Sequence, residues 1–200
     1  MALARQYADP YIEKTHYTEA EYFEFEQTAF GRWEYVDGEI RQMAGGKDDH
    51  NAIGGNIIRV LGNILALRDC RVYGSDMKIH TGDGVNTFPD VAVVCGDRQY
   101  YLGKEDVILN PLLVVEVLSP STKGYDRSDK FDHYKSTEAL QEYLLVDQDE
   151  LRVILHTRRD DHWELREVKG MDGSVYLSSV GDSLAMTDIY DKIKFKPEQS

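Results

Sequence analysis

The seven residues 112–118, Leu-Leu-Val-Val-Glu-Val-Leu, constrain the fold of this chain more than any other segment. Nearly continuous Val and Leu content predicts a central strand buried on both faces, with other layers of structure above and below it. Glu116 shares a face of that strand with Val114 and Leu118. Burying an unpaired carboxylate is costly, so Glu116 is protonated, paired with a cation or bound to a metal, unless the strand end reaches solvent.

Three helices are expected around this strand. Thr18 and Glu21 form a capping-box pattern that opens a helix running to about Thr28. Apolar residues spaced three and four apart predict a second, amphipathic helix over residues 50–67. A third helix is expected over residues 127–136, with Asp126 as its cap, and it would cross over from the central strand to the next one.

Strand patterns fill most of the remaining chain. Asp37-Gly38 is a type I′ turn signal and predicts a hairpin of residues 33–36 and 39–43. Further strands are expected over residues 71–73, 77–80, 88–95, 142–146, 151–156 and 163–168, the last three as a meander, and residues 189–195 are expected to form a terminal helix or strand. Helices alternating with mixed strands predict the α/β class, with a central mixed sheet flanked by helices.

Length and composition are those of one globular domain: 200 residues, 42% hydrophobic and 30% charged. We expect an N-terminal arm at residues 1–17 and a single domain at 18–200. Without a signal-peptide pattern or a long apolar run, a cytoplasmic protein with no membrane contact is expected. Cys70 and Cys95 lie far apart in the sequence, so both are expected to be reduced, with neither a zinc site nor a disulfide.

The net charge of −13 argues against a protein that coats nucleic acid by neutralising phosphates. It is compatible with an enzyme that touches a few phosphates through a metal ion and a local basic patch, because net charge does not fix where charges lie.

Asp90 is a second carboxylate that would act together with Glu116. It lies in Phe-Pro-Asp-Val-Ala-Val-Val, at the start of a second apolar strand. Alone it reads as a turn residue before a strand. Together with Glu116 it supplies the hard oxygen ligands that Mg²⁺ takes, with water and substrate phosphate completing the coordination.

Asp126, Lys130 and Tyr134 are spaced four apart and therefore share one face of the third helix. Asp126 and Lys130 alone are compatible with an exposed helical ion pair. If the helix packs back on the sheet, Lys130 would point toward the two carboxylates and could orient a water or stabilise charge on a phosphate.

These segments together resemble the Uma family of predicted restriction endonucleases, in the PD-(D/E)XK nuclease superfamily. The resemblance runs from about Thr18 to Ile193. The motifs that carry it are Trp33 to Glu39, His50 opening a helix, Phe88-Pro89-Asp90-Val91, Val115 to Thr122 with Asp126, Lys130 and Tyr134 following, and Glu142-Tyr143 before Val146-Asp147.

The resemblance implies a restriction-endonuclease-like core in which Asp90 is the motif aspartate and Glu116 the second acid. The superfamily lysine normally stands two residues after that acid, where this chain has Leu118. Lys130 is our candidate to replace it, and Lys123 is a weaker one. Glu34 matches the N-terminal acid of the family and would complete the metal site. The alternative is that Glu34 is a solvated residue of the hairpin. His50 could contact substrate or metal, or be a helix-capping or surface residue.

The function expected from these residues is metal-dependent hydrolysis of DNA by an endonuclease, with Mg²⁺ or Mn²⁺ held by Asp90, Glu116 and the carbonyl of Val117. Glu34, His50 and Asp126 would be auxiliary, and a homodimer would suit cleavage of two strands. One alternative is a nuclease-fold binding or regulatory module that no longer cuts. Another is a structural homodimer in which Glu116 is only ion-paired.

Overall fold

The computed structural model describes residues 14–120 and 123–195. The expected N-terminal arm therefore lies mostly outside the described residues. At its end, the Tyr17 backbone N–H donates to the carbonyl of Gly38 at 2.7 Å. Across the two described ranges, no helix is both long and apolar enough to cross a bilayer.

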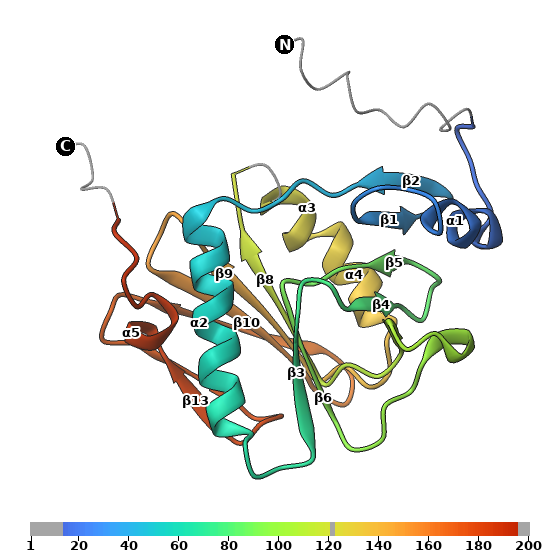
Figure 1. The fold of residues 1–200 in the computed structure, drawn as a ribbon. Helices are drawn as coiled ribbons and strands as arrows, with labels where there is room; N and C mark the ends of the chain where they lie inside the picture. Colours follow the sequence, from blue (N-terminus) through green and yellow to red (C-terminus); the bar gives the residue numbers. More distant parts are fainter. Residues whose placement is uncertain (1–13, 121–122, 196–200) are drawn as a thin grey trace.

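A six-stranded mixed sheet forms the centre of the molecule (Figure 1). Its order is β11-β10-β9-β8-β6-β3, and only β8 and β9 run parallel to each other. The central mixed sheet predicted from the sequence is therefore confirmed. The strands are β3 Cys70–Gly74, β6 Val91–Cys95, β8 Leu113–Leu118, β9 Glu142–Asp147, β10 Arg152–Arg158 and β11 Trp163–Lys169.

Helices cover both faces of this sheet, as expected of an α/β fold (Figure 1). The amphipathic helix α2, Asp48–Ile64, buries Ile53, Ile57 and Leu61 in the same apolar cluster as Val115 and Val117. That side also holds β12 Ser174–Leu177, β13 Asp182–Ala185 and the short α5 Met186–Ile189. On the opposite face, α4, Asp129–Lys135, packs on Val114 and Leu118. Glu116 shares the face of these two residues and therefore looks toward α4.

A smaller five-stranded sheet, ordered β2-β1-β5-β4-β7, adjoins the central one. Its hairpin is formed as predicted, because Asp37 and Gly38 both adopt positive φ, 51° and 86°. The predicted capping box also opens α1, where Thr18 and Glu21 hydrogen-bond reciprocally. The bounds here are α1 Glu19–Glu26, β1 Trp33–Val36, β2 Glu39–Gln42, β4 Lys78–His80, β5 Asn86–Thr87, the 3-10 turn η1 Tyr101–Gly103 and β7 Val107–Ile108.

The crossover between β8 and β9 differs from the single helix we expected. It consists of α3, Lys123–Arg127, and α4, separated at Ser128 with φ −119° and ψ −85°. The Ser128 hydroxyl is 2.9 Å from both the Gly124 carbonyl and a carboxylate oxygen of Asp129, and such local hydrogen bonds compete with helix continuation. Asp126 therefore lies inside α3 instead of capping a helix.

Two other expectations are wrong. Cys70 and Cys95 form a disulfide, because the antiparallel register of β3 and β6 places them directly opposite each other. Their separation of 25 residues gave no sign of that contact. The expected terminal element over residues 189–195 is also absent: α5 ends at Ile189, and residues 190–195 form no regular helix or strand.

Candidate active site

The two predicted acids lie beside each other at the ends of neighbouring strands. Val91 pairs with Val115 in the antiparallel register of β6 and β8, so one further step sets Asp90 next to Glu116. The Glu116 side chain is only 4% exposed, whereas that of Asp90 is 20% exposed. One acid is thus buried under α4 and the other reaches the surface.

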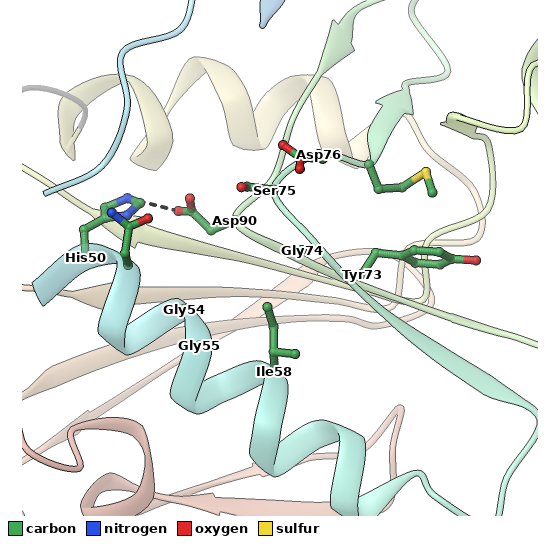
Figure 2. A pocket seen from close by; sticks show the side chains of 11 residues that line it. His50, Gly54, Gly55, Ile58, Tyr73, Gly74, Ser75, Asp76 and Asp90 are labelled. Atoms are coloured by element: carbon green, nitrogen blue, oxygen red, sulfur yellow. Dashed lines mark ion pairs between the residues drawn. The ribbon is translucent and has the colours of Figure 1, made fainter. Parts of the chain in front are cut away.

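Asp90 is held by the backbone of the strand that carries Glu116. Its Oδ2 accepts a hydrogen bond from the Val117 N–H at 2.7 Å. The same oxygen is 3.4 Å from Nε2 of His50, which lies in the first turn of α2 (Figure 2). Asp90 therefore connects β8 to α2 across the sheet edge.

Lys130 reaches Glu116 from α4, as expected if the crossover helix packs back on the sheet. Its Nζ is 2.9 Å from Oε1 of Glu116 and 3.6 Å from Oε1 of Glu34, and it donates to the Phe88 carbonyl at 3.3 Å. The lysine is 4% exposed. Leu118, two residues after Glu116, is buried in the apolar cluster under α4. An ammonium group thus occupies this face although the strand itself supplies none.

Glu34 joins the site from the smaller sheet, so it is not a solvated hairpin residue. It lies on β1, is 7% exposed, and accepts hydrogen bonds from the Thr87 hydroxyl and, at 3.3 Å, from the Phe88 N–H. Thr87 was not singled out from the sequence. Its only signal was its position just before Phe-Pro-Asp.

The Tyr134 hydroxyl completes the surroundings of Glu116, donating to Oε1 at 3.2 Å. Lys130 and Tyr134 are thus one helical turn apart on α4 and engage the same carboxylate oxygen. Lys123, the weaker lysine candidate, has its side chain outside the described part of the chain.

Burial and charge act together on the Glu116–Lys130 pair. Burial raises the pKa of Glu116 well above its usual value, the Lys130 ammonium opposes that shift, and the charge of Asp90 adds to it. Burial by itself would lower the pKa of Lys130, but Glu116, Glu34 and Asp126 outweigh it and raise that pKa well above its usual value. The lysine is therefore kept charged by the carboxyl groups around it.

His50 and Asp126 surround the two acids on other sides. The hydrogen bond to Asp90 raises the pKa of His50 against the opposing effect of burial, and the backbone of Val117 and the charge of Asp126 add to the increase. Asp126 is 4% exposed, and its backbone carbonyl accepts a hydrogen bond from the Tyr143 hydroxyl at 2.9 Å. The structure thus joins Asp90 to His50 and the Val117 N–H, and Lys130 to Glu116 and Glu34, while Asp126 acts on both groups through its charge.

The donor set is compatible with a hard divalent cation. Among the described residues, no three or more His, Cys, Asp or Glu side chains form a group that could hold a metal ion. Mg²⁺ commonly uses only one or two carboxylates, with waters and substrate phosphate as its other ligands. Asp90, just before β6, and Glu116, on β8, stand at neighbouring positions, and the Asp90 side chain is 20% exposed, so the two acids are of the kind and number that such a site uses.

A pocket of about 490 Å³ opens beside Asp90 (Figure 2). One wall is the first half of α2, with His50, Gly54 and Ile58, and the other is the end of β3 and the turn through Ser75 and Asp76. Since Asp90 and His50 both line it, a molecule that contacts the Asp90 carboxylate has this pocket next to it.

Known proteins are similar to this chain in sequence and in fold. A family model described as "Uma2: Putative restriction endonuclease" matches residues 19–187. Two uncharacterized proteins of Synechocystis sp. (strain PCC 6803) are similar: slr1290 is 37% identical over 177 residues, covering 88% of this chain and 92% of that protein, and sll1609 is 34% identical over 163 residues, covering 80% and 92%.

The fold resembles that of a solved structure from Anabaena variabilis ATCC 29413, described as a "putative nuclease belonging to DUF820". The TM-score is 0.66 at 23% identity, covering 79% of this chain and 89% of that one. The likeness extends over most of both chains, and at this level of identity it concerns the fold.

Proposed function

Because the chain belongs to the Uma2 family, described as "Putative restriction endonuclease", we propose that it is a metal-dependent endonuclease that hydrolyses phosphodiester bonds of DNA. The observation that carries this proposal is the contact between Lys130 and Glu116 beside Asp90. It supplies two acids and a lysine in one place although Leu118 occupies the usual lysine position.

The residues that would hold Mg²⁺ or Mn²⁺ are Asp90, Glu116 and the backbone carbonyl of Val117. When bound, such an ion would lower the pKa of a water molecule and offset charge on the scissile phosphate. Val117 already fixes the orientation of Asp90 through its N–H. His50 lies against the same carboxylate oxygen, so its part in the proposal is to position Asp90.

Lys130 would place its positive charge where negative charge develops during hydrolysis. Three contacts fix its ammonium group: Glu116, Glu34 and the Phe88 carbonyl. Such fixed donors need little reorganisation during the reaction. Glu34 and Asp126 contribute indirectly, because their charges help to keep Lys130 protonated.

The test uses substitutions that keep the shape of each acid, Asp90→Asn and Glu116→Gln. We expect either change to reduce Mg²⁺-dependent cleavage of plasmid DNA by at least about 100-fold, the scale expected for losing one key electrostatic group. Circular dichroism should show that both variants keep the fold, although Glu116→Gln should unfold at lower urea concentration because it leaves Lys130 without its nearest carboxylate. The control is Asp161→Asn, whose carboxylate is 89% exposed, lies in the turn between β10 and β11 and belongs to no part of the proposed site. Wild-type rates in both acid variants would remove these residues from the mechanism.

A second candidate function is a binding or regulatory module that keeps the nuclease fold without cutting. The buried pairing of Glu116 with Lys130 at 2.9 Å favours it, because such a pair is also a stable end state without metal. Calorimetric titration with Mn²⁺ separates the two functions. Mn²⁺ binding that Asp90→Asn abolishes supports the nuclease. No measurable Mn²⁺ binding by the wild type supports the binding or regulatory module instead.

The homodimer and the cytoplasmic location remain predictions. A dimer with a purely structural Glu116 pair would show a mass of two chains by analytical ultracentrifugation, and substitution of the pair would then leave any DNA cleavage unchanged. A single-chain mass would remove that alternative.

A further inference from the structure

Two adjacent glycines in the middle of α2, Gly54 and Gly55, have no packing explanation. Glycine weakens a helix relative to alanine. It is commonly retained where a neighbouring group approaches too closely for a side chain, yet a Cβ at either position would meet no atom within 4 Å. Gly54 is nevertheless buried. The empty volume next to these glycines is thus not filled by another part of the described chain.

That volume is the pocket that reaches Asp90 and His50 (Figure 2). With no side chains at Gly54 and Gly55, one wall of the pocket is helix backbone, which is exposed at Gly55, and Ile58 continues that wall as an apolar surface. A substrate with its scissile phosphate at Asp90 would therefore place the group attached to that phosphate along the bare helix.

The charges around the pocket limit the kind of chemical group, attached to the scissile phosphate, that can bind there. None of its eleven lining residues is Lys or Arg, and Asp76 stands at its rim with a side chain that is 98% exposed. The one cation at this rim among the described residues is the Arg32 guanidinium, which is already engaged by the Asp76 carboxylate at 3.7 Å and by the Ser75 carbonyl. A further phosphate would have to compete with Asp76 for it. A neutral, flat group would meet backbone and apolar surface, as a nucleobase does when it stacks.

We propose that this pocket receives the unpaired base of a nucleotide adjacent to the scissile phosphate, so that the substrate is single-stranded DNA or DNA with an unpaired nucleotide. The inference rests on the proposed function, because it takes Asp90 as the position of the phosphate. In an intact duplex the bases face each other, away from the backbone, and cannot enter a pocket beside a phosphate unless they are extruded. An unpaired base avoids the cost of that extrusion.

The test compares two substitutions on the same helix, Gly55→Leu and Gly62→Leu. Both glycines are exposed, and at both positions a Cβ would stand in open space, but only Gly55 lines the pocket. Replacing either glycine by a good helix former should raise the melting temperature by about 1–4 °C. Gly54→Ala is a second pocket variant that adds a single methyl group.

Binding is measured by fluorescence anisotropy of one labelled oligonucleotide, as a single strand and as its duplex, with Ca²⁺ replacing Mg²⁺ to suppress cleavage. We expect the wild type to bind the single strand about 10-fold more tightly than the duplex, on the scale of stacking one base. Gly55→Leu should lose about 10-fold in single-strand affinity, and Gly62→Leu should stay within about 2-fold of wild type.

The outcomes separate this inference from the proposed function. Equal affinity for duplex and single strand, no binding of either, or an unchanged affinity in both pocket variants overturns the inference. Cleavage of duplex DNA that is insensitive to Gly55→Leu keeps the nuclease and discards the pocket. Single-strand binding that depends on Gly55 without any Mg²⁺-dependent cleavage keeps the pocket and discards the hydrolytic function.

Discussion

At the residue scale, the buried pair of Glu116 and Lys130 dominates the energetics of the site. Each side chain is at most 5% exposed, and their nearest charged atoms are 2.9 Å apart. A buried pair does not always stabilise a fold relative to apolar residues, but removing one partner leaves an uncompensated charge. Neither residue can therefore be exchanged alone without affecting the stability of the whole domain.

We predict that Lys130→Met lowers the free energy of unfolding by about 3–5 kcal/mol at pH 8. Without the ammonium group, burial raises the pKa of Glu116 unopposed. A carboxyl group whose folded pKa lies above its unfolded value binds more protons in the folded state, so stability falls as the pH rises. The variant should therefore recover part of its loss on acidification to pH 5, as measured by urea denaturation at both pH values.

The matched control is the double variant Lys130→Met with Glu116→Gln, which removes both charges. It should be more stable than Lys130→Met alone at pH 8 and should lose the recovery at pH 5. If Lys130→Met unfolds with the wild-type free energy, the lysine is not buried against Glu116 in solution.

At the scale of elements, α4 joins the site to the core. Lys130 faces Glu116, and the next residue, Phe131, packs against Tyr143, His156 and Trp163 with ring centroids 5.0, 4.2 and 5.2 Å away. His156 lies on β10 and contributes a titratable imidazole ring to this cluster of aromatic rings. A change in the charge of His156 therefore alters the ring contact that holds α4, the helix that carries Lys130, against the sheet.

The second prediction concerns this contact. Burial, with a smaller effect of Lys135, lowers the pKa of His156 from 6.5 to about 4. Between these values the unfolded chain binds a proton that the folded chain does not, so stability decreases as the pH falls from 6.5 to 4. After allowance for partial exposure of the ring, we expect His156 to account for a loss on the order of 1–2 kcal/mol.

The measurement is the free energy of unfolding of wild type and His156→Phe at pH 7 and pH 4.5. The phenylalanine keeps the ring contact but does not titrate, so the wild type should lose more stability than the variant over that interval. Parallel losses in the two proteins would assign the pH dependence to other groups.

At the scale of the whole molecule, the net charge of −13 limits how DNA could be held. A protein that tracks many phosphates needs an extended basic surface. Here the site lies where α4, the central sheet and the smaller sheet meet, and its lysine is engaged by carboxylates. This arrangement favours recognition of a few groups around one phosphate.

We therefore predict weak salt dependence of DNA binding. With about one to three phosphates neutralised, the slope of log Kobs against log salt should lie between about −1 and −3. Anisotropy titrations at several NaCl concentrations, with Ca²⁺ held constant, measure it. A slope steeper than about −5 would indicate an extended phosphate-binding surface and contradict this prediction.

Local sequence patterns were sufficient for several elements and for singling out Glu116. Thr18 and Glu21 specify the start of α1, Asp37-Gly38 the hairpin, and the Val and Leu content of residues 113–118 the buried strand. Glu116 was recognisable because a carboxylate inside an apolar strand needs a partner. The sequence did not reveal the helix break at Ser128. The break depends on hydrogen bonds of the Ser128 hydroxyl to Gly124 and Asp129, and serine also occurs inside continuous helices.

The sequence by itself determined which residues need partners, because burial of Val and Leu and desolvation of a carboxylate are properties of short segments. Only the tertiary structure decided which contacts form: strand register joins Cys70 to Cys95 against the expectation of two reduced cysteines, packing of α4 turns the expected approach of Lys130 to Glu116 into a direct contact, and the second sheet delivers Glu34. The physical reason is that contacts between distant segments depend on how whole sheets and helices pack, and no spacing within one segment encodes that.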